Sequence, residues 1–449
     1  MLEFSELSRD GHPLVLMQVR EPPGPVNQFE FTCAPDDPVF QALEAMTSEQ
    51  EIVRAAGELL FTALAEAPAL SPALTAALRI QPPDQRPIYV NVTGLSLGQA
   101  LPWETLFAPA IHDFLSLDPR WPVGRIVPGA RPEPTPWRLD PPLRIAAVLS
   151  CLGVPADEEW QALRAAVEES GLDCRVCLLV SENELYQRIE AARLPWADLA
   201  KVPSDYAGLQ SLITRFNPHV LHLFCHGSTG HGGPHLEVAV GSDWLTGTAD
   251  RSHFLESRGI RELTPVTAAT PWLIVLNACE SATPATLDVG PQTLASALVA
   301  DYAVPAVVGM RQPVLSVDAA RFTRRFYASL FETLRRALDR SAAELGIDWA
   351  SLAVTARDAL RRGRDSLPPT SAAARTTQWT LPVVHVRPTQ FMLQIVTPAA
   401  LGPESNRARL ESSLLEALLA ALPADTPAQT IDALTERLRQ RRELALGRS

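Results

Sequence analysis

Alternation between short apolar runs and amphipathic stretches fills residues 143–386 and restricts the possible folds more than any other feature. Short runs rich in Leu, Ile and Val are typical of strands buried on both faces, as in a parallel sheet. The alternation therefore predicts an α/β fold with a mainly parallel sheet flanked by helices. The predicted strands are 143–149, 174–180, 219–224, 272–276, 305–309 and 381–386, the predicted helices 157–170, 182–192, 206–216, 293–302 and 318–338, and long loops are expected at 228–271 and 364–378.

Further segments flank this core, which we assign to a domain at 143–395. Residues 1–128 contain predicted strands at 14–19, 28–32 and 87–92 and a helix at 48–64, so we expect an N-terminal α/β half. The proline-rich residues 129–142 are predicted to be an extended linker. A short helical tail is expected at 396–449, where Leu recurs at helical spacing from 410 to 422 and Thr426-Pro427 begins a second helix. The tail could pack on the body or dock on a partner.

Composition limits the partners and the compartment. A net charge of −12 argues against direct nucleic-acid binding, which depends on clustered Lys and Arg. The N-terminal residues lack the pattern of a signal peptide, and no apolar stretch approaches the ~20 residues that span a bilayer. We therefore expect no membrane partner and a cytoplasmic protein. Six cysteines fit reduced thiols in that compartment better than a disulfide framework.

His226 and Cys279 lie just past two of the predicted strands and are the candidate catalytic residues. Because ligands of open α/β sheets bind beyond the carboxyl ends of the strands, both side chains are expected to face one cleft. A general base beside a thiol is sufficient for covalent attack on a carbonyl. A separation of 53 residues is also similar to the caspase spacing. These residues predict a cysteine peptidase that uses a His-Cys dyad and an acyl-enzyme.

Several segments resemble the CHAT family of the caspase clan, to which separase is related. The similarity extends from about residue 86 to residue 387, and its most specific part surrounds Cys279. The similar segments are His226-Gly227, Asn277-Ala278-Cys279-Glu280-Ser281, Leu101-Pro102-Trp103-Glu104-Thr105-Leu106, Val304-Pro305-Ala306-Val307-Val308-Gly309-Met310 and Trp379-Thr380-Leu381-Pro382-Val383-Val384. The resemblance implies a caspase-like protease domain preceded by a pseudo-protease-like half, and no cofactor.

The resemblance also implies roles for individual residues. The backbone N–H groups of Gly227 and Cys279 would form the oxyanion hole, and a glycine lets a substrate carbonyl approach the backbone. In Arg-specific relatives such as separase, an acidic residue lines the substrate pocket, but Ser316 stands at the equivalent position here. Asp318 and Glu280 are the nearest alternative acids. We therefore expect a pocket that tolerates small or apolar side chains.

Other residues could form a metal or redox site. His222, His226, His231 and His235 with Cys225 could bind zinc, but His222 lies in a strand-like run. Cys174 and Cys177 have redox spacing but lie within a strand, and Cys225 could form a regulatory disulfide with Cys279.

Three function classes remain open. The favoured one is a protein-cleaving endopeptidase of a bacterial defence system, kept weakly active until a regulatory protein partner binds, with the 228–271 loop or the helices after residue 398 restraining the cleft. The others are a non-catalytic caspase-like adaptor that assembles through its C-terminal helices, and a thiol hydrolase or acyltransferase acting on a small molecule.

Overall fold

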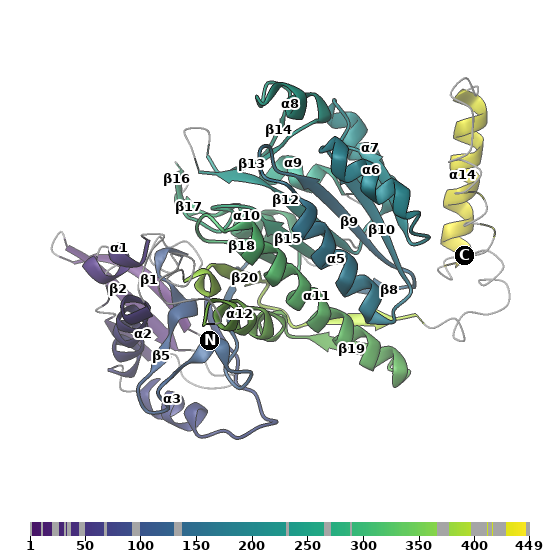
Figure 1. Cartoon of the computed structure of the whole chain (residues 1–449). Coiled ribbons are helices and arrows are strands. Elements are labelled where there is room, and N and C mark those ends of the chain that lie inside the picture. The colour runs from purple at the N-terminus through teal and green to yellow at the C-terminus, as the bar shows by residue number, and fades with distance from the viewer. Residues whose placement is uncertain are drawn as a thin grey trace.

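A mostly parallel sheet runs through the molecule and carries helices on both faces (Figure 1). The computed structural model describes residues 2–9, 12–19, 27–30, 33, 37–44, 50–66, 70–91, 99–129, 137–229, 233–264, 271–287, 290–365, 377–396, 411, 415 and 428–445. The strand order is β11 (Ala197–Lys201), β10 (Cys174–Val180), β9 (Leu143–Ser150), β12 (Val220–Ser228), β15 (Leu273–Asn277), β18 (Ala306–Met310), β20 (Pro382–Val386), β7 (Val123–Ile126), β4 (Ile88–Asn91), β1 (Leu2–Arg9), β2 (His12–Val19) and β3 (Asn27–Glu30). The predicted α/β architecture is confirmed.

The direction of the strands changes in the middle of this sheet. Strands from β11 to β18 are parallel to one another, whereas β20 is antiparallel to β18 and begins a second parallel group with β7, β4 and β1. The central strands β9, β12, β15 and β18 are mostly apolar and are buried over most of their length. Burial on both faces explains why their sequences are continuous apolar runs.

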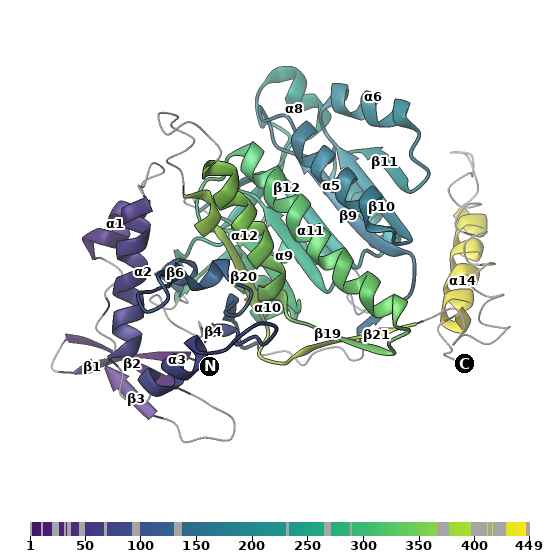
Figure 2. The same cartoon turned by 60° about the horizontal axis from the view of Figure 1, so that its bottom comes forward.

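The helices divide between the two faces according to the direction of their crossovers. On one face, α5 (Asp157–Ser170), α11 (Ser316–Asp339) and α12 (Trp349–Asp365) lie side by side (Figure 2). The connection that contains α5 leads from β9 toward the β11 edge of the sheet, whereas the later connections lead from β11 toward β18. Because connections between parallel strands are right-handed, the helices of these later connections are expected on the other face of the sheet. These helices are α7 (Tyr206–Phe216), α9 (Ser257–Glu262) and α10 (Leu294–Tyr302), while α6 (Asn183–Ala192) connects β10 to β11. The predicted boundaries of α5 and α7 agree with the structure.

The predicted loop at 228–271 is wrong over most of its described part. It contains β13 (His235–Val238), α8 (Gly241–Thr246), β14 (His253–Leu255) and α9, and β13 pairs antiparallel with the end of β12. Each of these elements is too short to give a periodic pattern in the sequence. The two strands form by pairing, β13 with the end of β12 and β14 with β13. Pairing with β13 extends β12 to Ser228, beyond the predicted strand end at residue 224.

The predicted linker also contains regular structure. Residues 130–136 lie outside the described residues, but Trp137–Leu139 form β8. This strand pairs with β21 (Phe391–Ile395), which in turn pairs with β19 (Glu344–Ile347). The linker assignment fails for these residues because the pairing partner is more than 200 residues away in sequence. The other domain boundaries stay predictions.

The N-terminal half holds α1 (Pro38–Glu44), α2 (Gln50–Ala65), α3 (Leu70–Leu78) and short elements between β4 and β7. The short elements are η1 (Trp103–Thr105), β5 (Phe107–Ala108), β6 (Asp113–Phe114) and η2 (Leu115–Leu117), and η4 (Gln378–Thr380) precedes β20. Among the described residues, no single helix is long and apolar enough to cross a membrane, and only the bent pair of α2 and α3 passes by combined length and composition.

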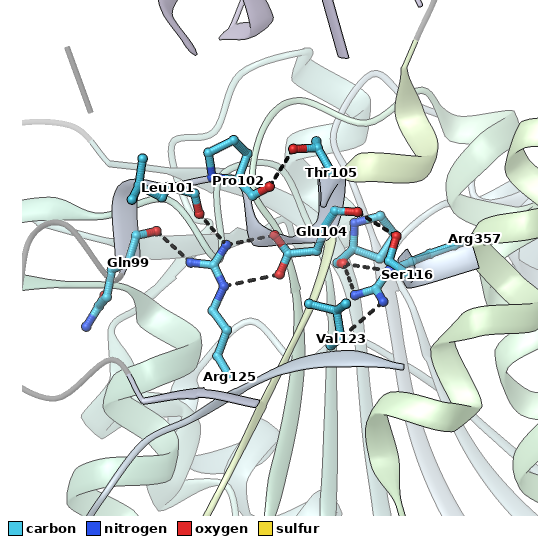
Figure 3. A network of polar contacts seen from close by, with 10 residues as sticks. Gln99, Leu101, Pro102, Glu104, Thr105, Ser116, Val123, Arg125 and Arg357 are labelled. Atoms are coloured by element: carbon cyan, nitrogen blue, oxygen red, sulfur yellow. Dashed lines mark hydrogen bonds and ion pairs between the residues drawn. The ribbon is translucent and has the colours of Figure 1, made fainter. Parts of the chain in front are cut away.

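A buried ion pair fixes η1 against β7 (Figure 3). Arg125 donates from Nε and Nη2 to the two carboxylate oxygens of Glu104 at 3.1 and 2.8 Å, and both side chains are completely buried. Burial alone would raise the pKa of Glu104, but Arg125 outweighs it and holds that pKa below its usual value. Arg357 of α12 donates to the carbonyls of Val123 and Pro382, at 3.2 and 2.8 Å. These cations thus join η1, β7, β20 and α12.

The C-terminal helix α14 (Ala428–Ala445) stands beside the body in both views (Figures 1 and 2). It confirms the second helix predicted for the tail. Of the first predicted helix, only Glu411 and Leu415 are described, and both are helical. Arg441 of α14 pairs with Glu411 at 2.9 Å.

Candidate active site

The ends of β12 and β15 bring the two candidate catalytic residues opposite each other. The strands pair in parallel from Val220 and Leu273 to Phe224 and Asn277. His226 lies two residues past the last strand pair on β12, and Cys279 lies two residues past it beyond the end of β15. The expectation that neighbouring strands carry these residues is confirmed.

Gly227 packs directly against the backbone of Cys279. A Cβ atom at residue 227 would lie 2.0 Å from the Cys279 carbonyl oxygen and 3.1 Å from its carbonyl carbon. The backbone of Gly227 does not have a positive φ, so the glycine is required for space and not for a turn. We expected a substrate carbonyl to need this space, whereas the structure fills it with the nucleophile's own carbonyl.

A backbone carbonyl orients the His226 ring. Nε2 of His226 lies 2.7 Å from the carbonyl oxygen of Leu152, in the loop between β9 and α5. A carbonyl can only accept a hydrogen bond, so Nε2 carries the proton and the neutral ring has its lone pair on Nδ1. The imidazole is therefore prepared to act as a base through Nδ1. Sequence reasoning missed Leu152, since a backbone carbonyl leaves no signature in the residue type.

Cys279 is the one cysteine of six that is not buried. Burial raises the pKa of the neighbouring Cys151 thiol to about 12 and raises that of Cys225 well above its usual value. The pKa of Cys279 is raised as well, first by partial burial and then by the Glu280 carboxylate. The backbone N–H groups of Val314 and of Cys279 itself lower the pKa of Cys279 and so oppose this rise. The resting thiol is therefore protonated at neutral pH and needs a base.

Val314 belongs to the loop between β18 and α11 and is a second group that the sequence did not reveal. Its backbone N–H lowers the pKa of Cys279, because it favours the thiolate form. Ser316, the residue expected to replace the pocket acid, is the first residue of α11 just beyond it. The loop that was expected to line the substrate pocket therefore lies beside Cys279 at Val314.

The two alternative pocket acids are each engaged within the protein. Asp318, in the first turn of α11 and 8% exposed, accepts a hydrogen bond from Arg321 Nη1 at 2.5 Å. Glu280 has a φ of 56° and accepts hydrogen bonds from the N–H and hydroxyl of Thr229, at 3.2 and 3.0 Å. The left-handed backbone of a non-glycine residue costs about 1–3 kcal/mol. These hydrogen bonds connect the turn that contains Cys279 and Glu280 to Thr229, the residue that follows β12.

The rival sites take other positions in the fold. His222 is fully buried with Nε2 2.9 Å from Glu159, and His231 lies outside the described residues. Within the part of the chain that the structure describes, no three His, Cys, Asp or Glu side chains are grouped to hold a metal ion. Cys174 and Cys177 are buried free thiols of β10, and Cys225 is also free.

Comparison with known proteins agrees with this description. Residues 178–346 match the family model described as the CHAT domain. Two crystal structures of the Saccharomyces cerevisiae separase–securin complex are similar over 82% and 79% of this chain, each at 12% identity and a TM-score of 0.34. The similarity covers 21% and 20% of those chains. No curated protein matches the sequence. The matched residues include β12, β15 and both His226 and Cys279, so this part of the chain is similar to the CHAT domain.

Proposed function

We propose that this protein is a cysteine endopeptidase that cleaves a protein substrate through His226 and Cys279. The observation that carries the proposal is the pairing of β12 with β15, because His226 lies near the end of β12 and the partly buried Cys279 follows β15. The ring is fixed from behind by the Leu152 carbonyl. A base, a thiol and a fixed orientation are the minimum for nucleophilic catalysis.

The reaction begins with transfer of the Cys279 proton to Nδ1 of His226. Sulfur then attacks the peptide carbonyl carbon, and the N–H groups of Gly227 and Cys279 stabilise the oxyanion. Protonated His226 gives its proton to the leaving amine, which leaves an acyl-enzyme. Water, deprotonated by His226, attacks the thioester, and the carboxylic acid and the thiol are released. The raised pKa of Cys279 makes this base essential, because few thiolates are present beforehand.

The substrate pocket is proposed to favour small or apolar side chains before the scissile bond. Asp318 is paired with Arg321 and Glu280 with Thr229, so neither carboxylate is free to bind a basic side chain. The loop beside the thiol contributes Val314, and Val317 is 44% exposed on the first turn of α11. The apolar side chains of Val314 and Val317 and the engagement of both acids within the protein support this preference over Arg or Lys.

Regulation by a protein partner in a bacterial defence system completes the proposal. The raised pKa of the resting thiol supports a weakly active isolated enzyme. The paired strands β13 and β14 and the helices after residue 398 are the segments proposed to restrain the cleft. The free cysteines fit a cytoplasmic location.

Peptide-library cleavage by the wild type, by Cys279→Ala and by a chain ending near residue 398 tests these proposals separately. We expect cleavage after small or apolar residues, loss of cleavage in Cys279→Ala and a faster truncated chain. Cleavage that persists in Cys279→Ala would refute the nucleophile. A strict Arg requirement would refute the pocket. An unchanged rate on truncation would remove the helical tail as a restraint.

A further inference from the structure

A buried carboxylate lies in the core behind the proposed catalytic residues. Glu159, in the first turn of α5, is fully buried through its side chain. Its Oε1 atom receives three close contacts from different elements, namely Asn277 Nδ2 at 2.9 Å, Thr323 Oγ1 at 2.5 Å and His222 Nε2 at 2.9 Å. Asn277 also donates to the carbonyl of Ala319 at 3.2 Å. One oxygen atom therefore joins α5, β12, β15 and α11.

The same four elements supply the groups around the thiol. The loop that leads into α5 provides the Leu152 carbonyl, and β12 carries His226 four residues after His222. Cys279 follows Asn277 by two residues, and the loop that leads into α11 provides the Val314 N–H. Each element in contact with the carboxylate thus carries one of the four groups two to nine residues from the contact.

The arrangement is poorly suited to stability alone. Oε2 of Glu159, Oδ1 of Asn277 and Nε2 of His222 are buried without a hydrogen-bond partner among the described residues, so the contact of His222 with Glu159 is close but not a hydrogen bond. A buried charge that is only partly satisfied stabilises a fold no better than well-packed apolar side chains of similar volume. Directional contacts to three elements can, however, fix the relative position of strands and helices that apolar contacts would let slide.

We propose that Glu159 is a positioning residue that sets the geometry of His226, Cys279, Leu152 and Val314 by holding their four elements together. The inference rests on the proposed thiol chemistry. Loss of the charge weakens the contacts of Asn277 and Thr323 and allows the ends of β15 and α11 to shift. The Val314 N–H then moves away from the sulfur, and the Leu152 carbonyl no longer holds the ring in place.

The test compares Glu159→Gln with Glu104→Gln, a variant of an equally buried carboxylate in the N-terminal half. Iodoacetamide labelling of Cys279 is followed by mass spectrometry from pH 6 to pH 10, with Cys279→Ala as the blank. A misplacement near 1 Å costs about a hundredfold in rate, so we expect labelling of Glu159→Gln at pH 7.5 to fall about tenfold or more. Its labelling profile should move to higher pH, and kcat should fall with little change in KM.

Glu104→Gln should lower the melting temperature without moving the labelling profile. A Glu159→Gln variant that only melts earlier, with a wild-type labelling profile, would overturn the inference. If that variant fails to fold, Thr323→Val removes one contact and should move the profile in the same direction by a smaller amount; an unmoved profile would again overturn it. A shifted profile in a protein without any peptidase activity would refute the proposed function and leave the positioning role standing.

Discussion

Replacing Gly227 by alanine tests the contact between the two strand ends. The added Cβ would lie 2.0 Å from the Cys279 carbonyl oxygen, whereas ordinary contact begins near 3.4 Å. Both atoms belong to backbone or sit directly on it, so no side-chain rotation relieves the overlap. One strand end must move by about 1 Å, and a displacement of this size near reacting atoms costs about a hundredfold in rate.

Gly241→Ala is the matched control. Its added Cβ would be 3.6 Å from the nearest atom, the Ser181 carbonyl oxygen, which is ordinary contact. Both variants and the wild type would be assayed for peptide cleavage and for labelling of Cys279, after their melting temperatures are measured. We expect a loss of about a hundredfold in kcat/KM for Gly227→Ala and wild-type values for Gly241→Ala. Wild-type activity in folded Gly227→Ala would refute the reasoning.

Three further predictions concern charges. Glu280→Gln removes a negative charge that raises the pKa of Cys279, so labelling at pH 8 should become a few times faster, about two- to tenfold; an unchanged pH profile would contradict this. Glu104→Ala leaves Arg125 buried without its counter-charge, so the free energy of unfolding measured in urea should fall by about 3–5 kcal/mol. A fall of less than about 1 kcal/mol would contradict this prediction. Burial, followed by the Arg125 charge, lowers the pKa of His385 to about 3. The unfolded chain therefore binds the extra proton as pH falls from 7 to 4, and the wild type should lose about 3 kcal/mol of stability that His385→Leu retains. Equal losses in both proteins would be inconsistent with that pKa.

The sequence predicted the sheet and the neighbouring strand ends that carry the candidate residues, because both depend on short-range patterns. The buried central strands are continuous apolar runs, and the polar residues at their ends must meet at one edge of a parallel sheet. That argument was sufficient to bring His226 and Cys279 together. Helix α5 was likewise delimited by Gly171, which has the left-handed conformation of a helix C-terminus.

Backbone groups and long-range pairing were beyond sequence reasoning. The Leu152 carbonyl and the Val314 N–H act through atoms that every residue possesses, so only the path of the chain reveals them. Strands β13 and β14 are each too short to show a period and exist through pairing at the end of β12.

The central claim is tested most directly by covalent labelling with a peptidyl electrophile that carries a small apolar residue next to the reactive group. Intact-protein mass spectrometry would compare the wild type, Cys279→Ala and His226→Ala, with Cys225→Ala as the control for a buried neighbouring thiol. The account predicts one adduct per chain on Cys279, no adduct in Cys279→Ala, strongly slowed labelling in His226→Ala, and normal labelling in Cys225→Ala. Equal labelling of the wild type and Cys279→Ala would contradict it.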